Sequence, residues 1–178
     1  MSTNLAYAYF EEPKNEELID GQIVAMAPAR TEHNSASTAI AGMFWNHFRG
    51  KKCRVYSTEA MTILSENDHF APDVMVVCRS DIAIDGKIIG APELVVEVLS
   101  RSTAKRDRGY KKNAYEKHGV KEYWIVDVEF RIIEVFVLLN GKFEMDNIYS
   151  GDESGTTFSP SIFEDLVISV DEVFEKVD

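Results

Sequence analysis

Three short apolar runs dominate the hydrophobic pattern of the chain. Residues 74–78 read Val-Met-Val-Val-Cys, residues 94–99 read Leu-Val-Val-Glu-Val-Leu, and residues 123–126 read Tyr-Trp-Ile-Val. Nearly continuous apolar runs of this length are typical of strands buried on both faces of a sheet. The pattern therefore predicts three central strands, with residues 79–91, which are mixed and contain glycine, forming a loop.

Helical spacing marks two longer segments. Residues 31–49 predict a helix with a stripe of apolar residues, made of Ala36, Ile40, Met43, Phe44 and Phe48. We expect Thr31 to cap the start of this helix, and Gly50 follows its end. Residues 103–118 predict a second helix, with Gly119 as its C-terminal cap.

Turn residues indicate hairpins near both ends. Asp20-Gly21 divides residues 17–27, and Asn140-Gly141 joins strands expected at 132–139 and 142–149. Shorter strands are expected at 54–58 and 60–64, and the tail carries residues 161–167 and an amphipathic turn at 171–177. The order predicts one α/β domain over residues 1–178. A mixed central sheet is flanked by helices, with an extra N-terminal hairpin and C-terminal strands.

The cellular compartment is suggested by the cysteines and by the apolar runs. Cys53 and Cys78 form no Cys-x-x-Cys pair, so we expect two reduced thiols in a cytosolic protein. Residues 1–10 lack the basic start and apolar core of a signal peptide. No apolar run approaches the roughly 20 residues of a membrane helix. The sequence therefore predicts a cytoplasmic protein without a membrane partner.

The net charge of −11 argues against a protein that simply coats nucleic acid, because phosphate neutralisation drives such binding. Carboxylates that hold a metal also count as negative, so an enzyme is not excluded. The basic residues gather in two stretches: Arg101, Lys105, Arg106, Arg108, Lys111, Lys112, Lys117 and Lys121, and then Arg49, Lys51, Lys52 and Arg54. Each stretch is either a solvent-exposed charged surface or a positively charged surface that attracts a polyanion.

Two carboxylates stand where apolar residues are expected. Glu97 lies among aliphatic neighbours in the second run, and Asp73 directly precedes the first run, behind Pro72. A buried carboxylate without a partner costs several kcal/mol, so each needs a counter-charge or a metal. On adjacent strands the two could converge on a divalent cation such as Mg²⁺ or Mn²⁺. For Glu97, the alternative is a structural ion pair with the following helix.

Pro72-Asp73 followed by Glu97 resembles the Pro-Asp … (Asp/Glu)-x-Lys nuclease core. Within that superfamily the chain is similar to a large bacterial family of restriction-endonuclease-like proteins, the Uma-type family. The matching stretches are residues 17–21, 71–74, 91–100, 102–103, 106–111, 115 and 119–127. The resemblance implies a restriction-endonuclease-like fold. It also implies that Asp73, Glu97 and the Val98 carbonyl bind Mg²⁺ or Mn²⁺.

One position departs from the superfamily pattern, because Leu99 stands where a lysine is expected two residues after Glu97. The resemblance implies that Lys111, in the next helix, supplies this ammonium, and Lys112 is its competitor. A nearby ammonium can orient the attacking water and offset phosphate charge. Asp107, Lys111 and Tyr115 share one helix face. The alternative is a surface Asp107–Lys111 pair worth a few tenths of a kcal/mol.

His33 lies in the first turn of the first predicted helix, in line with its buried stripe. It is either a satisfied core histidine or, as the resemblance implies, a site residue that assists proton transfer near neutral pH. Glu32 and Glu59 are weaker acidic candidates, since each is expected to be a solvated charge.

The first hypothesis is a Mg²⁺- or Mn²⁺-dependent endonuclease that hydrolyses phosphodiester bonds in nucleic acid, DNA above all. The second is a nuclease-like domain that has lost turnover and binds nucleic acid or protein. The third is a homodimeric scaffold that uses Trp124 and the C-terminal strands as its interface. The chain contains no phosphate loop, no His-Glu-x-x-His and no Gly-x-Ser-x-Gly motif, which removes the main support for nucleotide-driven, zinc and serine hydrolases.

Overall fold

The computed structural model describes residues 16–57 and 60–175. Its central sheet has the strand order β12-β11-β10-β9-β6-β3. The strands are β3 Arg54–Ser57, β6 Val74–Val77, β9 Leu94–Val98, β10 Glu122–Asp127, β11 Ile132–Leu139 and β12 Lys142–Ser150. β9 and β10 run parallel, and the other neighbours are antiparallel. The three apolar runs are therefore adjacent central strands, as predicted.

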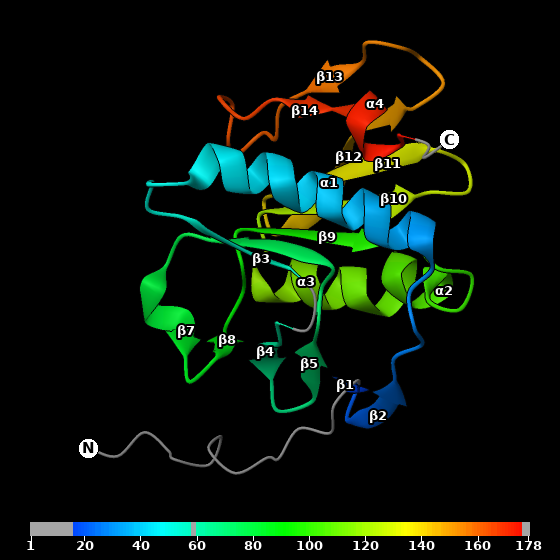
Figure 1. Ribbon diagram of the computed structural model, residues 1–178. Helices are drawn as coiled ribbons and strands as arrows, with labels where there is room; N and C mark the ends of the chain where they lie inside the picture. Colours follow the sequence, from blue (N-terminus) through cyan, green and yellow to red (C-terminus); the bar gives the residue numbers. More distant parts are fainter. Residues whose placement is uncertain (1–15, 58–59, 176–178) are drawn as a thin grey trace.

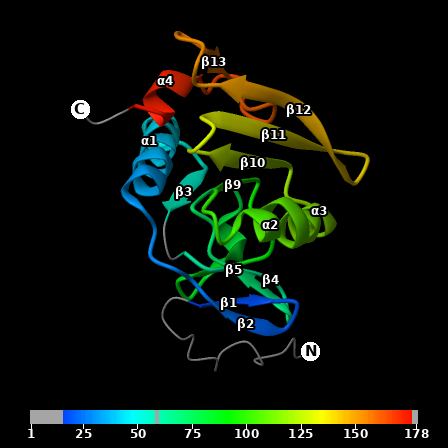
Figure 2. The ribbon, with the colours of Figure 1, turned by 90° about the vertical axis from the view of Figure 1, so that its right-hand side faces the viewer.

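Helices cover both faces of this sheet (Figures 1 and 2). Helix α1 (Thr31–Phe48) lies on one face. The other face carries a continuous helical span made of α2 (Ala104–Arg106), the π-helical turn η3 (Asp107–Lys111) and α3 (Lys112–His118). Alternate residues of β9 divide between the two cores: Val96 packs with the α1 side and Val95 with the α3 side. Because the side-chain period of a strand is two, Glu97 points toward the α3 side.

A smaller sheet lies beyond α3, with the order β2-β1-β5-β4-β8-β7. Its strands are β1 Glu16–Ile19, β2 Gln22–Ala25, β4 Thr62–Ser65, β5 Asp68–Phe70, β7 Ala83–Ile84 and β8 Lys87–Ile89. The predicted turn at Asp20-Gly21 is confirmed, since both residues adopt positive φ. The structure likewise confirms the turn at Asn140-Gly141.

The expectation of a loop over residues 79–91 was wrong. This segment contains the 3₁₀ turn η2 (Ser80–Ile82) and the β7–β8 hairpin around Asp85-Gly86, where both turn residues have positive φ. β8 also pairs with β4 and buries Ile88. Strands of two and three residues are too short to show a period in the sequence, so only the tertiary pairing reveals them.

The C-terminal segment packs over α1 and closes that core. It contains β13 (Thr157–Phe158), β14 (Ile168–Ser169) and α4 (Val170–Val173), while the end of the turn expected at 171–177 lies outside the described residues. Trp124 contacts the rings of Phe44 and Phe158 and is fully buried. Trp124 is thus a core residue, and the idea that it forms a dimer interface was wrong.

The ends of the helices agree with the sequence only in part. Gly119 adopts the left-handed conformation and caps α3, as predicted. The expectation for Thr31 was wrong: Arg30 is the N-cap residue, no side chain caps the helix, and the Thr31 hydroxyl donates to Glu32 instead. Thr31 is already the first helical residue, so its side chain is one position too late to act as the cap.

The two cysteines are joined in a disulfide, so the expectation of free thiols was wrong. β3 and β6 are antiparallel with Arg54 opposite Val77, and this register places Cys53 opposite Cys78. The disulfide removes one of the arguments for a cytosolic protein, since disulfides are rare in reducing compartments.

None of the helices in residues 16–57 and 60–175 has both the length and the apolar character needed to cross a bilayer.

Removal of this disulfide should destabilise the fold. The bond closes a loop across a sequence separation of 25 residues, and a closed loop of that length is worth about 3.5 kcal/mol in the chain-entropy account. We expect the Cys53→Ala, Cys78→Ala double variant to lower the free energy of unfolding by this amount in urea titrations under oxidising conditions. Under a dithiol reductant, the wild type and the double variant should unfold at nearly the same urea concentration. A difference that persists after reduction would contradict the assignment.

Candidate active site

Glu97 meets the helical span through two hydrogen bonds to a single oxygen. The ammonium of Lys111 donates to Glu97 Oε1 at 2.9 Å, and the hydroxyl of Tyr115 donates to the same atom at 2.9 Å. Glu97 Oε2 takes part in neither contact. Lys111 is 3% exposed and Glu97 is 4% exposed. The ion pair expected as an alternative for Glu97 is therefore present, and it is formed by the lysine that the family resemblance selects.

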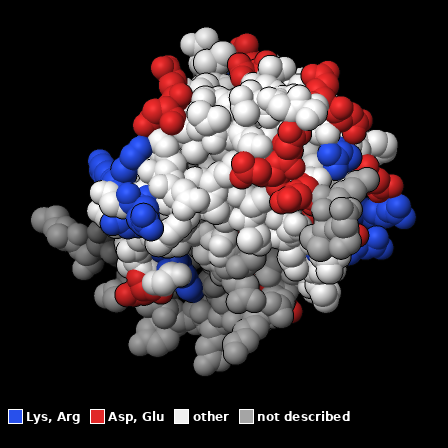
Figure 3. Space-filling view, turned by 45° about the horizontal axis from the view of Figure 1, so that its top comes forward, with Lys and Arg blue, Asp and Glu red and all other residues white. Residues whose placement is uncertain are grey.

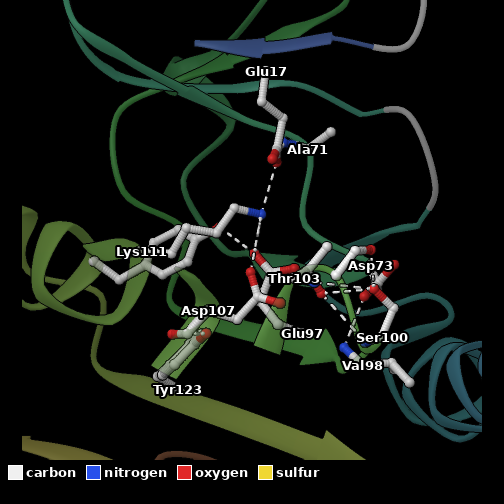
Figure 4. Close-up of polar contacts among 12 residues, drawn as sticks. Glu17, Ala71, Asp73, Glu97, Val98, Ser100, Thr103, Asp107, Lys111 and Tyr123 are labelled. Carbon is white, nitrogen blue, oxygen red and sulfur yellow. Dashed lines mark hydrogen bonds and ion pairs between the residues drawn. The ribbon is translucent and has the colours of Figure 1, made fainter. Parts of the chain in front are cut away.

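Lys111 lies among three carboxylates. Its Nζ atom is 2.7 Å from Glu17 Oε1 and 3.8 Å from Asp107 Oδ1, in addition to its contact with Glu97 (Figure 4). We call Glu17, Glu97, Asp107 and Lys111 the Lys111 cluster. All four side chains are buried. The interpretation of Asp107 and Lys111 as a surface pair was therefore wrong.

The charges of the Lys111 cluster shift the pKa values of its members. Burial raises the pKa of the Glu97 carboxyl well above its usual range; Lys111 opposes this, and the carboxylates of Asp107, Asp73 and Glu17 reinforce it. Burial by itself would lower the pKa of Lys111, but Glu97, Glu17 and Asp107 together raise it. One ammonium is thus the counter-charge of several carboxylates. Lys111 therefore stays protonated, and Glu97 binds a proton more tightly than an exposed glutamate does.

Asp73 lies beside the end of β9. Its Oδ2 atom accepts a hydrogen bond from the backbone N–H of Val98 at 2.7 Å and lies 3.3 Å from His33 Nε2 (Figure 4 shows Asp73 and Val98). Burial lowers the pKa of His33, but Asp73 and the Val98 backbone outweigh it, and the net shift is upward. The structure therefore brings together Asp73, directly before β6, His33 of α1 and Val98 of β9.

The donor atoms suit a hard divalent cation. Asp73 and Glu97 are close enough that the charge of Asp73 raises the pKa of Glu97, and a cation held by both would offset this repulsion. In the described part of the chain, no group of three or more His, Cys, Asp and Glu side chains is arranged to hold a metal. Mg²⁺ requires only one or two carboxylates, because waters and substrate phosphates complete its shell. Two carboxylates and the Val98 carbonyl fit that requirement.

The weaker candidates lie away from this arrangement. Lys112 points to the other side of its helix, with Nζ 3.5 Å from the centroid of the Phe136 ring, and burial lowers its pKa. Glu32 is exposed on the first turn of α1. Glu59 lies outside the described residues. Of the two lysines, only Lys111 contacts Glu97.

Glu17 is the site residue that the sequence did not reveal. It comes from β1 of the small sheet, is 3% exposed, and also accepts a hydrogen bond from the backbone N–H of Ala71 at 2.9 Å. Residues 17–21 belong to the stretches that match the family, but the local pattern is that of an ordinary hairpin strand. The only available signal was an acid inside a matching stretch, and its partner is far away in the sequence.

Three of the eight basic residues in the stretch 101–121 pair with carboxylates in the described part of the fold. Arg101 pairs with Glu129, Arg108 pairs with Glu134 and Asp127, and Lys111 is buried in its cluster. On the face that Figure 3 shows, acidic side chains are widely spread and basic ones gather in small groups near its edges. These pairings reduce the free positive charge that this stretch could offer to a polyanion.

The chain resembles known proteins along most of its length. Residues 3–171 match the family Uma2, described as "Putative restriction endonuclease". The uncharacterized protein slr1290 of Synechocystis sp. (strain ATCC 27184 / PCC 6803 / Kazusa) is 36% identical over 123 residues, which cover 67% of this chain and 65% of that protein. The uncharacterized protein sll1609 of the same organism is 27% identical over 131 residues, covering 70% of this chain and 74% of that one.

A solved structure has the same fold. The crystal structure of "a putative nuclease belonging to DUF820" from Anabaena variabilis ATCC 29413 superposes with a TM-score of 0.75. It covers 94% of each chain at 20% sequence identity. The expected restriction-endonuclease-like α/β fold is thereby confirmed. On the evidence of the match over residues 3–171, the chain belongs to the Uma2 family.

Proposed function

We propose that this protein is an endonuclease that hydrolyses phosphodiester bonds in DNA and depends on Mg²⁺ or Mn²⁺. The observation that carries the proposal is that Asp73, directly before β6, accepts a hydrogen bond from the residue that follows Glu97 in the neighbouring strand β9, while Lys111 donates to Glu97. The family and the fold support a nuclease in general. The metal and the DNA substrate rest on the chemistry of these residues.

Each residue of the site has a distinct role in this proposal. Asp73, Glu97 and the Val98 carbonyl would hold the cation, which would polarise the scissile phosphate and make water more acidic when bound. Lys111 keeps a positive charge beside Glu97, where it can orient the attacking water and offset the charge that develops on the phosphate. His33, held by Asp73, is placed to carry a proton at its Nε2 atom.

The direct test is cleavage of a mixed panel of single-stranded, duplex and branched DNA, together with RNA, in the presence of Mg²⁺ or Mn²⁺. We expect wild-type protein to cut DNA only with the metal, and Glu97→Ala to show no cutting above the background. Equal cutting by the Glu97→Ala variant would point to a contaminating nuclease. Absence of cutting by the wild type on every substrate would refute the proposal.

A second candidate is a nuclease-like domain without turnover that binds nucleic acid or protein. The observation that favours it is that Glu97 and Lys111 are both buried and already form an ion pair within the fold, which is what a structural role without turnover requires. Filter binding with the same panel separates the two candidates, because the second predicts retention of a substrate without metal-dependent products. As part of the first candidate we propose a homodimer, since cutting two strands requires two sites. Sedimentation equilibrium tests the dimer.

A further inference from the structure

The turn that carries Lys111 is not an ordinary α-helical turn. η3 is a single π-helical turn between α2 and α3, and such turns are rare and often occur at functional sites. Lys111 is the last residue of η3, and Tyr115 follows it in α3. The π turn therefore comes directly before the helical turn whose Lys111 and Tyr115 side chains both donate to Glu97.

Arg108 fastens η3 to the central sheet. Its Nη1 atom donates to both carboxylate oxygens of Glu134, at 2.5 and 2.6 Å, and its Nη2 atom lies 3.6 Å from Asp127 Oδ2. Glu134 belongs to β11 and Asp127 to β10, so one guanidinium links η3 to two neighbouring strands. Charge-assisted hydrogen bonds of this kind are about twice as strong as neutral ones.

Two tyrosines hold η3 at other points. The hydroxyl of Tyr123, on β10, donates to the backbone carbonyl of Asp107 at 3.0 Å in a buried position (Figure 4). This carbonyl belongs to the first residue of η3, where the regular α-helical pattern is interrupted. The hydroxyl of Tyr110 donates to Asp68 of the small sheet at 2.9 Å. η3 is thus held by the central sheet and by the small sheet, and Lys111 points between them.

We infer that Arg108 and Tyr123 are positioning residues, which hold the π turn in the geometry that keeps the Lys111 ammonium on Glu97. Arg108 and Tyr123 donate hydrogen bonds to Glu134 and to Asp107, not to Glu97, so both act on Lys111 through η3. Only the catalytic use of Lys111 rests on the proposed function. The positioning itself is a property of the resting protein and can be measured without turnover.

The measurement is proton–nitrogen NMR of lysine side chains in ¹⁵N-lysine-labelled full-length protein, with the Lys111 signal assigned by its loss in Lys111→Met. We expect a slowly exchanging ammonium signal in the wild type. In Arg108→Gln and in Tyr123→Phe, exchange with water should become about tenfold faster, because loosening η3 makes local opening more frequent. Absence of a Lys111 signal in the wild type would overturn the inference.

Matched controls separate positioning from general loss of stability. Lys142→Gln breaks an exposed ion pair between β12 and Glu116 of α3, and Tyr149→Phe removes a hydroxyl from the same sheet. Neither should change Lys111 exchange. Because Arg108→Gln leaves Glu134 without its partner, the double variant Arg108→Gln, Glu134→Gln keeps the test valid if the single variant fails to fold. Unchanged exchange in both this double variant and Tyr123→Phe refutes the inference.

Kinetics then connect the positioning to the reaction. If the wild type cleaves DNA, Tyr123→Phe should lower kcat about tenfold and leave KM unchanged, because only the transition-state contact of Lys111 is weakened. Equal kcat values for Tyr123→Phe and wild type, together with faster exchange, would show that Lys111 is held by η3 but not used in catalysis. That outcome would contradict the catalytic role of Lys111 and leave the positioning of its ammonium intact.

Discussion

Replacing Lys111 with methionine is expected to lower the free energy of unfolding by about 3–5 kcal/mol, the usual cost of removing one partner from a buried ion pair. Lys111 and its carboxylate neighbours Glu17, Glu97 and Asp107 are all buried, and their shortest contact is 2.7 Å. Without the ammonium, these carboxylates lose their common counter-charge in the protein interior. Urea denaturation monitored by circular dichroism measures the loss.

Two variants test whether the effect comes from the buried charge. Lys112→Met removes an ammonium from the same helix, where it lies over the Phe136 ring, and should cost no more than about 1 kcal/mol. Adding Glu17→Gln to Lys111→Met should recover about 1–2 kcal/mol, since groups that share a contact are coupled by amounts of this order. Additive effects of Glu17→Gln and Lys111→Met would contradict the description of the Lys111 cluster.

Asp73→Asn should abolish metal-dependent cleavage and weaken Mn²⁺ binding. The asparagine has nearly the same shape, and its carbonyl oxygen can still accept from the Val98 N–H, so the fold should persist. We expect the affinity for Mn²⁺ to fall by at least about 100-fold, because loss of an outer-shell partner alone typically costs about 10- to 100-fold. Isothermal titration calorimetry provides the affinity, and the DNA panel provides the rate.

Glu32→Gln is the matched control for Asp73→Asn. It removes one carboxylate from the exposed first turn of α1, near His33 in sequence but outside the contacts of Asp73. Its Mn²⁺ affinity and its cleavage rate should equal those of the wild type. If Asp73→Asn bound Mn²⁺ as tightly as the Glu32→Gln control, Asp73 would not be a metal ligand and the proposed site would be incorrect.

The sequence by itself determined the central strands and the two carboxylates. Apolar runs of about four to six residues indicate burial on both faces of a sheet. An acid inside such a run must have a partner, so Glu97 was recognisable from its neighbours alone. The turns at Asp20-Gly21 and Asn140-Gly141 were also predictable, because adjacent residues that tolerate positive φ specify a tight turn without help from the rest of the fold. Helical spacing placed Lys111 and Tyr115 on one face, and both donate to Glu97.

Only the tertiary structure decided which distant groups meet. Glu17 contacts Lys111 because the small sheet packs against η3, and Cys53 reaches Cys78 because of the register between β3 and β6. The π turn at η3 is likewise held by side chains of other elements, such as Arg108 bound to Glu134. Strand register and sheet packing depend on contacts between residues far apart in sequence, and local periodicity contains no information about those contacts.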